Sequence, residues 1–556
     1  MLIRDLFVGA AIVSLVACGG GGSKPDNTDN SPQPGANPPP AAQADEQANM
    51  MPMPGGTPGL PGSGSPISPT PGTTPPVTPP ITSPTTPPTT PPITSPVTPA
   101  PTTQAAFQFL PVLSDADGNP NDTSATYNLT ADTNVPVRVD TPTGSWTTPM
   151  MRYNSLQLPP VIKARRGTNV TINVQNNLGE DTTVHWHGFK IPAIQDGGPE
   201  SPIAPGTSHT YNFQIQQAGG PLWFHPHADG TTATQVYNGL AGAFVVTDDI
   251  TDALEANKQI PAGNYDVPLL IQDRSFAADN GSGVRPLVYG GMMVGMMGML
   301  GDRVLVNNVE QPTLNVETRQ YRFRLFNGSN ARTYDFGLSN GATFRVVATD
   351  GGLLPAPVAT DRIVLGAGER AEIVVDFRGT GVNDSLALIN RSMNNLAVVR
   401  FNVTTAVTDD VTLYSSLPAN ADIYQRLTAN DANNTRNFVM STGGMMGFVI
   451  NGQRFNVNRI DEVVPNGATE IWAISNTSGM AHPFHAHAIQ WQILDRNNVP
   501  ASGIDLGWKD TVLVQPGETV RFIGRFDPVI NTGLYYYHCH ILEHEERGMM
   551  GTFEIQ

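Results

Sequence analysis

The segment Asn169-Val170-Thr171-Ile172-Asn173-Val174 alternates polar residues with valine and isoleucine. Because successive side chains of a strand point to opposite faces, this alternation predicts a strand with one buried face. Similar runs at 320–325, 372–377 and 519–523 are separated by stretches rich in Gly, Asn, Asp and Pro, and no long amphipathic helical pattern competes with them. Such runs with turn signals between them predict an all-β fold of sandwiches or barrels.

A weak internal repeat divides the strand-rich part of the chain into three units of about 145 residues. Each unit has a glycine-containing turn that leads into a strand: Pro205-Gly206-Thr207, Gly366-Ala367-Gly368-Glu369 and Pro516-Gly517-Glu518-Thr519. We therefore predict three domains, at 106–250, 251–410 and 411–556, of which the middle one contains no histidine.

Residues 1–17 have the pattern of an export signal. Arg4 precedes an apolar run from Leu6 to Ala17, which is too short to span a bilayer as a helix and has the length of a signal-peptide core. The run ends in Leu15-Val16-Ala17-Cys18, which resembles the lipobox of bacterial lipoproteins. The resemblance implies lipidation of Cys18 and a membrane anchor, with the outer membrane favoured because Gly19 follows. The alternative is an ordinary cleaved signal with a chance cysteine, and on either reading we expect export to the periplasm or cell surface.

Residues 18–105 are predicted to form a disordered linker rich in Pro, Thr and Gly. Half of the chain's prolines, 25 of 50, lie between Pro25 and Pro101. Large apolar residues are almost absent, so the segment cannot bury a core. Its composition favours a semi-rigid tether of polyproline II character between the anchor and the strand-rich domains.

Charge and cysteine content exclude several functions. The chain has 48 acidic and 31 basic residues, and the net charge of −17 argues against binding to nucleic acid or to an anionic membrane surface, which need clustered Lys and Arg. One of the 2 cysteines, Cys18, lies in the signal region. Cys539 therefore has no partner, and a disulfide framework is excluded.

All of the 11 histidines except His209 lie in four short clusters. The clusters are His185-Trp186-His187, His225-Pro226-His227, His482-Pro483-Phe484-His485-Ala486-His487, and His538-Cys539-His540 with His544. Histidines two residues apart on a strand point to the same side. One such pair is commonly a surface or core feature, but four clusters in one chain predict a metal centre.

The last cluster indicates copper. A thiolate from Cys539, imidazoles from His482 and His544, and a weak thioether from Met549 are the ligand set of a blue-copper site. Zinc is the main competitor, but structural zinc sites typically use a closed set of four Cys or His ligands. A single cysteine placed between two further histidines does not fit such a site.

Through these motifs the chain resembles the three-domain multicopper oxidases, and most closely bacterial cuprous oxidases of the copper-efflux type and bacterial laccases. Local matches include Asp196-Gly197-Gly198-Pro199 and Trp508-Lys509-Asp510-Thr511-Val512. The resemblance implies three cupredoxin-like Greek-key β-sandwich domains after the tether. It also implies one type 1 copper, one type 2 copper and a type 3 pair, which couple the one-electron oxidation of a small reductant to the reduction of dioxygen to water.

Carried across by position, the resemblance assigns every clustered histidine. The type 1 copper of the third domain takes Cys539, His482, His544 and Met549. The type 2 copper takes His185 and His485. Six histidines are implied as ligands of the type 3 pair: His187, His225, His227, His487, His538 and His540.

Two carboxylates and the type 1 ligands are implied in catalysis. By the family pattern, Asp196 and Glu545 lie in the path of oxygen and protons, and the alternative for each is a solvated loop acid. Cys539 lies between two type 3 ligands, so an electron on its sulfur is one residue away from that pair. We expect electrons to enter through His482 and His544, with an imidazole edge at the surface.

The positions of the methionines are relevant to which reductant the protein oxidises. One run contains Met292, Met293, Met296, Met297 and Met299, and a second contains Met440, Met445 and Met446. Thioethers bind cuprous copper, but methionine also fills irregular apolar gaps. Met480 matches a methionine of the family's cuprous substrate site, whereas the carboxylate expected two residues earlier is Ser478.

Three functional classes follow. A metallo-oxidase would oxidise cuprous or other metal ions, in copper tolerance, and a laccase would oxidise phenols and aromatic amines. A non-enzymatic copper-binding protein is disfavoured because every ligand is retained. A copper nitrite reductase is disfavoured because it has no type 3 pair.

Overall fold

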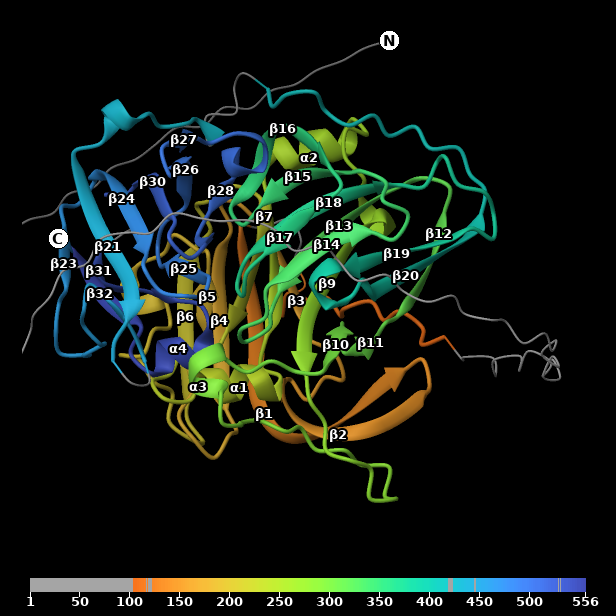
Figure 1. Ribbon diagram of the computed structural model, residues 1–556, viewed down its shortest axis with the longest axis horizontal. Coiled ribbons are helices and arrows are strands. Elements are labelled where there is room, and N and C mark those ends of the chain that lie inside the picture. Colours follow the sequence, from red (N-terminus) through yellow and green to blue (C-terminus); the bar gives the residue numbers. More distant parts are fainter. Residues whose placement is uncertain are drawn as a thin grey trace, which may run out of the picture. The chain divides into compact units, whose positions relative to one another are not determined.

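The computed structural model describes residues 104–116, 118, 123–418, 424–444, 447–528, 530 and 532–556. The predicted signal segment, Cys18 and nearly all of the predicted tether lie outside these residues, as do Met445 and Met446. Strands dominate the described part (Figure 1), and the all-β prediction is confirmed. The α-helices are short: α1 (Thr232–Asn238), α2 (Asp249–Ala256), α3 (Val294–Met297) and α4 (Leu542–Glu546). None of them is long and apolar enough to cross a membrane.

The largest sheet passes through both the first and the middle unit. Its order is β16-β15-β18-β13-β9-β10-β11-β1-β4-β6, with β2 paired to β1, and a parallel contact between Asp140 and Val309 joins its two halves. Its strands are β1 (Ser124–Thr141), β2 (Gly144–Tyr153), β4 (Asn169–Asn176), β6 (Ser208–Gln214), β9 (Asp266–Arg274), β10 (Arg303–Val306), β11 (Val309–Glu310), β13 (Gln320–Asn327), β15 (Phe344–Thr349), β16 (Gly352–Thr360) and β18 (Arg370–Asp376).

Smaller sheets complete each unit. In the first unit the order is β3 (Val161–Arg165), β8 (Gly242–Thr247), β7 (Gly220–His225), β5 (His185–His187). In the middle unit it is β12 (Thr313–Glu317), β20 (Leu396–Thr405), β19 (Ser385–Asn390), β14 (Tyr334–Leu338), β17 (Ile363–Leu365).

The third unit contains two sheets. One has the order β22 (Phe448–Ile450), β21 (Asn434–Thr442), β24 (Thr469–Asn476), β30 (Thr519–Arg525), β26 (Trp491–Arg496), β27 (Val499–Pro500), with β28 (Trp508–Lys509) paired to β26. The other has the order β23 (Glu462–Val464), β32 (Met550–Ile555), β31 (Gly533–Cys539), β25 (His482–Ala486), β29 (Thr511–Val514).

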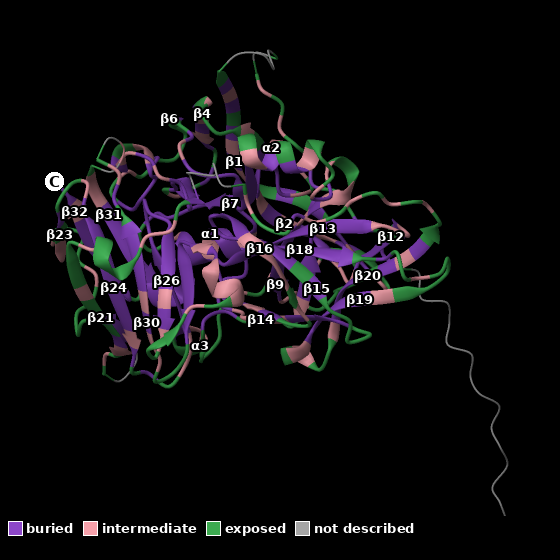
Figure 2. Ribbon diagram, turned by 90° about the horizontal axis from the view of Figure 1, so that it is seen from above, coloured by how far each residue is buried: buried purple, intermediate pink, exposed green. Residues whose placement is uncertain are grey.

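A separate apolar core fills each unit, and buried residues run through the interior of all three (Figure 2). In β4 the alternating residues Val170, Ile172 and Val174 are buried, as the sequence pattern predicts. Strand β13 is buried along its whole length, because Tyr321, Phe323 and Leu325 pack in the core of the middle unit and the alternate residues Arg322 and Arg324 pair with Asp266. The predicted domain boundaries near residues 250 and 410 stay predictions.

Asparagine-containing hairpins fix the register of two strand pairs. Asn307 and Asn308 join β10 to β11 with φ angles of 49° and 66°, and Asn497 and Asn498 join β26 to β27 with 50° and 65°. Two successive left-handed residues make a type I′ turn, whose twist matches that of the flanking strands.

Strand pairing brings the histidine motifs together within each unit. In the first unit β5 pairs with β7, so that His185 lies opposite His225. In the third unit β25 pairs with β31, so that His485 lies opposite His538 and Phe484 opposite Cys539. The motifs thus become neighbours through sheet register.

Candidate metal centres

The first centre lies where β25, β31 and α4 meet. The Cys539 Sγ lies 3.3 Å from His482 Nδ1 and 3.7 Å from His544 Nδ1. Met549 is buried beside them, since its carbonyl accepts a 3.0 Å hydrogen bond from the Cys539 amide. One sulfur and two imidazole nitrogens therefore face a common point.

Neither imidazole of this centre reaches the surface. His482 is 0% and His544 1% exposed, which differs from the expectation that an imidazole edge would be open to solvent. His544 Nε2 lies 3.0 Å from the carbonyl of Met296 in α3, and His482 Nε2 lies 2.8 Å from Ser478 Oγ. Phe448 covers both rings, with centroids 4.8 and 4.4 Å away. Segments remote in sequence therefore close the site.

Burial raises the pKa of the Cys539 thiol well above its ordinary value, and the carboxylates of Glu545 and Glu543 add to the effect. Burial likewise lowers the pKa of His482 to about 3 and that of His544 to about 4. A site that disfavours both charged forms needs a cation to stabilise the thiolate.

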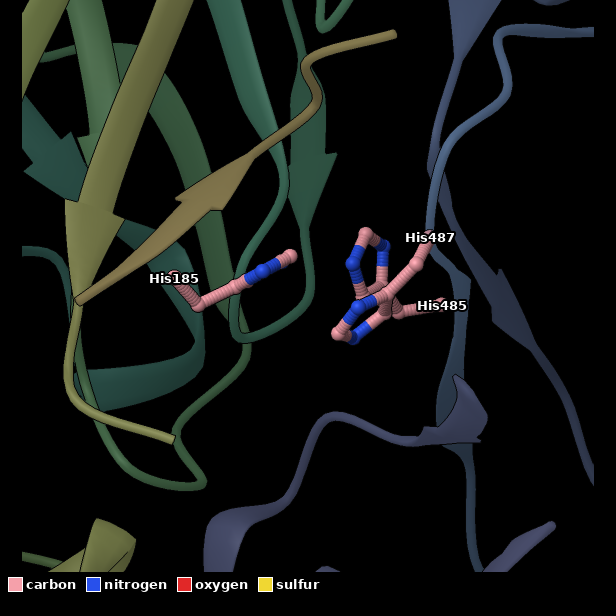
Figure 3. Close-up of side chains that lie close together, drawn as sticks. All are labelled: His185, His485 and His487. Carbon is pink, nitrogen blue, oxygen red and sulfur yellow. The ribbon is translucent and has the colours of Figure 1, made fainter. Parts of the chain in front are cut away.

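The second centre gathers the other eight clustered histidines, all at most 1% exposed. It lies between the first and third units, and Figure 3 shows His185 reaching across toward His485 and His487. His185 Nδ1 lies 3.0 Å from the carbonyl of Asp196, and His485 Nδ1 lies 2.9 Å from the carbonyl of Asp510. A carbonyl only accepts, so both Nδ1 atoms carry the proton and both Nε2 atoms keep a lone pair. Those two Nε2 atoms are buried without a partner.

Three further inner nitrogens converge at a second point. His538 Nε2 lies 3.2 Å from His227 Nε2 and 3.3 Å from His487 Nε2. On the outer side, His487 Nδ1 lies 2.6 Å from Asp196 Oδ2 and His538 Nδ1 lies 2.9 Å from Glu545 Oε2. Acceptors thus hold the protons outside and leave the lone pairs inside.

A third point is bounded by His187, His225 and His540. His187 Nδ1 lies 3.3 Å from His225 Nε2, and the ring of His540 is centred 5.0 and 5.3 Å from those two rings. Both nitrogens of His540 lack a partner. Burial lowers the pKa of His225 to about 3, so that this imidazole is neutral and keeps a lone pair.

This arrangement fits metal ions. Buried lone pairs that face one another without a shared donor are costly, and a cation at each point would satisfy them. Neutral imidazoles and one buried thiolate suit copper, and outer acceptors orient ligands in such sites. The described residues also contain groups of three with metal-binding spacing: His482, Cys539 and His544 at the first centre, and His227, His487 and His538, His185, His485 and His487, and His185, His187 and His225 at the second.

The predicted carboxylates lie in the outer layer of this second centre. Burial raises the pKa of Asp196 well above its ordinary value, and Glu200 adds to the shift. Burial alone would also raise the pKa of Glu545, but His538 and His227 lower it to about 2. The two carboxyls therefore differ: one favours holding a proton and the other favours the charged form.

Asp510 also contacts this centre, although the sequence motif around it did not reveal such a role. Its Oδ1 lies 2.9 Å from His187 Nε2, across 323 positions of sequence. The available sequence signal was the local family match at Trp508-Lys509-Asp510-Thr511-Val512. The structure adds that Asp510 precedes β29, which pairs with the histidine strand β25.

The methionines are distributed over different environments. Met292, Met293, Met296 and Met297 are exposed around α3, with Met292 98% exposed, whereas Met299 is buried. Met440 is buried in the core of the third unit, and Met480 packs against that core. Among the methionines that the structure describes, Met292, Met293, Met296 and Met297 therefore offer exposed thioethers around α3, beside the first centre.

The chain matches models of the multicopper oxidase family over residues 135–250, 265–408 and 417–556. It is 35% identical to multicopper oxidase mco of Staphylococcus aureus, over 72% of this chain and 83% of that one. It is 31% identical to a laccase of Bacillus subtilis, over 72% and 89%. A laccase structure from Pediococcus acidilactici superposes with a TM-score of 0.73 at 32% identity, covering 82% of this chain and 95% of that one.

Proposed function

We propose roles for individual residues from the premise that the chain belongs to the multicopper oxidase family. Its domains are accordingly cupredoxin-like, and it is a copper-dependent oxidoreductase that uses four coppers and dioxygen as acceptor. Bound copper supplies one-electron oxidation at a mononuclear site and multi-electron storage at a trinuclear site. The assignment of ligands, proton groups and reductant given below is our proposal.

The ligand roles follow the three points of convergence and the thiolate site. Cys539, His482, His544 and Met549 hold the type 1 copper, and the free Nε2 atoms of His185 and His485 hold the type 2 copper. The two groups of three histidines hold the type 3 pair: His227, His487 and His538 on one copper, and His187, His225 and His540 on the other. Carbonyl and carboxylate acceptors lie beside one nitrogen of six of these rings and support this division, because they leave the other nitrogen of each with a lone pair; the six are His185, His187, His225, His485, His487 and His538.

Asp196 and Glu545 are the carboxyl groups that we assign to proton transfer and ligand positioning beside this cluster. The raised pKa of Asp196 suits a carboxyl that delivers a proton, and its Oδ2 lies within reach of His487 Nδ1 at 2.6 Å. The carboxylate of Glu545 holds His538 in place from the other side, at 2.9 Å. Asp196 orients two ligands, since its carbonyl accepts from His185 Nδ1 and its carboxyl accepts from His487 Nδ1. Glu545 lies beside His538 as a charged neighbour, while His538 Nδ1 is 3.2 Å from the carbonyl of Cys539.

The preferred reductant is cuprous ion. The observation that carries this proposal is the position of α3, whose Met296 carbonyl lies against His544 Nε2 while four neighbouring thioethers face solvent. Thioethers bind cuprous ion, so an ion held there would lie next to the imidazole that accepts its electron. Ser478, which stands in place of the carboxylate of the family's cuprous site, is hydrogen-bonded to His482 and offers no charge.

Phenols are the second candidate. A laccase needs an apolar depression at the type 1 site. One described cavity, of about 600 Å³, includes Ala481 next to His482, but its other walls carry Arg362, Arg496, Lys509 and Glu369. These charged walls disfavour a neutral phenol in this cavity, and its cationic side chains do not suit cuprous ion either, so the case for cuprous ion rests on the thioethers around α3.

Oxygen uptake by the copper-loaded protein separates the candidates. We expect a larger kcat/KM with cuprous ion than with a dimethoxyphenol. Changing Met292, Met293, Met296 and Met297 together to Leu is expected to raise KM for cuprous ion by about tenfold, equivalent to ~1.4 kcal/mol, and to leave the phenol unaffected. Met151→Leu, a partly buried position in the core of the first unit, is the matched control. Preference of the wild type for the phenol would favour a laccase, and equal loss with both reductants would overturn the role of the four thioethers in binding cuprous ion.

We further propose that the protein is exported and works in copper tolerance. The predicted signal at 1–17 and lipidation of Cys18 support a membrane-anchored form facing the periplasm or cell surface. Mass measurement of the membrane-extracted protein would detect acylation of Cys18, and Cys18→Ser would release the protein to the soluble fraction. A non-enzymatic copper-binding role is disfavoured, because all the ligands for four coppers are present.

A further inference from the structure

Arg370 of the middle unit contacts both other units, through Pro221 of the first and Asp510 of the third. It begins β18, and its side chain is 0% exposed. Each of its terminal nitrogens donates to a different oxygen of Asp510, both over 2.6 Å. Its Nε donates to the carbonyl of Pro221 over 2.9 Å. A guanidinium group that is hydrogen-bonded through both terminal nitrogens and through Nε cannot rotate, and it therefore fixes the position and orientation of the Asp510 carboxylate.

Asp510 has every acceptor direction occupied. In addition to Arg370, its carboxylate accepts from Thr511 Oγ1 at 2.9 Å and from Gln490 Nε2 at 3.0 Å. Its remaining contact is His187 Nε2, 2.9 Å from Oδ1, while its main-chain carbonyl lies 2.9 Å from His485 Nδ1. One residue therefore contacts a ligand from the first unit and a ligand from the third.

We propose that the Arg370–Asp510 pair is a positioning device that holds His187 with its proton on Nε2 and its Nδ1 lone pair turned toward one copper of the type 3 pair. The inference rests on the proposed role of His187 as a ligand. A neutral imidazole has one donor and one acceptor nitrogen, and a fixed carboxylate at Nε2 makes that nitrogen the donor. His187 Nδ1 is then the acceptor that faces His225 Nε2.

Two glycines pack closely against the pair and against a ligand of the same copper. A Cβ added to Gly188 would lie 2.6 Å from Asp510 Oδ2 and 2.9 Å from Arg370 Nη2. A Cβ added to Gly368, whose carbonyl accepts from Arg370, would lie 2.8 Å from the His540 ring. Pro221 precedes His225 in β7. Arg370 therefore contacts Asp510, which holds His187, the carbonyl of Gly368, which packs on His540, and Pro221 at the start of the strand that ends in His225, so the middle unit does more than separate its neighbours.

The test compares Asp510→Asn and Arg370→Lys with the wild type. Asp510→Asn removes the negative charge that orients His187. Arg370→Lys replaces the bidentate guanidinium by a single ammonium group, which can bind only one point of the carboxylate. We expect a competing chelator to remove type 3 copper from each variant at a concentration about 10–100-fold lower than it needs for the wild type. Losses of this size are typical when a residue that hydrogen-bonds to a metal ligand is replaced. The blue absorbance of the type 1 copper is expected to stay, because its ligands do not touch Arg370 or Asp510.

Electron paramagnetic resonance gives a second readout. An intact type 3 pair gives no electron paramagnetic resonance signal because its two coppers are magnetically coupled. A pair that has lost one copper leaves a single cupric ion, which gives a signal. Arg324→Lys is the matched control, because Arg324 is a buried arginine of the same unit that pairs with Asp266 and contacts no ligand. The control is expected to lose stability without a type 3 signal.

The outcomes are distinguishable. Loss of type 3 copper with the type 1 colour intact supports the positioning role. Equal loss of all four coppers, or a pattern identical to that of Arg324→Lys, would show that the pair only stabilises the fold and would overturn the inference. A wild-type protein that fails to bind four coppers would instead overturn the proposed ligand roles.

Discussion

Replacing Asp196 by Asn should slow oxygen reduction without removing copper. The amide is the same size as the carboxyl, so its oxygen can still accept from His487 Nδ1, at 2.6 Å in the wild type. The main-chain carbonyl that accepts from His185 Nδ1 is unchanged. The variant loses only the exchangeable carboxyl proton. General acid–base catalysis contributes about 10²–10⁴-fold, and at 1.36 kcal/mol per tenfold this is about 2.7–5.4 kcal/mol of barrier.

The assay isolates the oxygen step. The fully reduced protein is mixed with dioxygen, and the return of the blue type 1 absorbance is followed. Reduction of the oxidised protein under anaerobic conditions is measured separately, and it should be unchanged because the type 1 site lies elsewhere. Glu200→Gln provides a graded perturbation, since Glu200 contributes to the raised pKa of Asp196.

The pH dependence has a defined sign. Because the pKa of Asp196 is raised, its carboxyl holds a proton over a wider pH range than an ordinary aspartate. Reoxidation of the wild type should therefore be fast below this raised pKa and slow down as the pH rises through it. The Asn variant should lack that decline. If the Asp196→Asn variant binds its full complement of copper and is reoxidised at the wild-type rate, the proton-delivery role is refuted.

Three further predictions test the geometry. Gly368 has a φ of 82° and no room for a Cβ beside His540, whereas Gly206 has a φ of 75° and open space. Ala at either position costs about 1–2 kcal/mol of strain, but only Gly368→Ala should lower type 3 copper content, and equal copper loss from both would contradict the packing argument. The raised pKa of Cys539 predicts that its thiol resists a disulfide reagent in the native copper-free protein and reacts once the chain is unfolded in denaturant. The measurement uses the Cys18→Ser variant, so that Cys539 is the one thiol present. Rapid labelling of the native protein would contradict the burial of this thiol. Although burial opposes its ionisation, the pKa of Asp266 is held well below its usual range by Arg322 and Arg324, so Asp266→Asn should cost about 3–5 kcal/mol of unfolding free energy at pH 7. That difference should shrink as the pH falls below the unfolded value of about 3.9, and an equal cost at pH 7 and pH 3 would exclude the ion pair as its origin.

The sequence predicts what depends on local pattern. Alternation at 169–174 places the correct residues of β4 in the core, and the histidine spacing brings His185 and His187 onto one short strand. The resemblance to a family supplied ligand roles that periodicity alone does not contain.

Long-range contacts explain what the sequence does not predict. The cover over His544 comes from Met296, 248 positions away, and the partner of His187 Nε2 is 323 positions away. Neither contact leaves a periodic trace in either segment, because each depends on how separate units pack. The expected exposure of the type 1 imidazoles fails for this reason, and Arg370 could not be distinguished from an ordinary strand arginine.

The trinuclear site has a consequence for the assembly of the molecule. His227 and His538, which face one another across 3.2 Å, are 311 residues apart along the chain. Closing a flexible loop of that length costs on the order of 5 kcal/mol of chain entropy, so copper that bridges its ends acts as a reversible cross-link of the native state. Any ion bound only by the folded chain stabilises it by mass action. Copper supply should therefore set the protein's lifetime against heat and proteolysis as well as its activity.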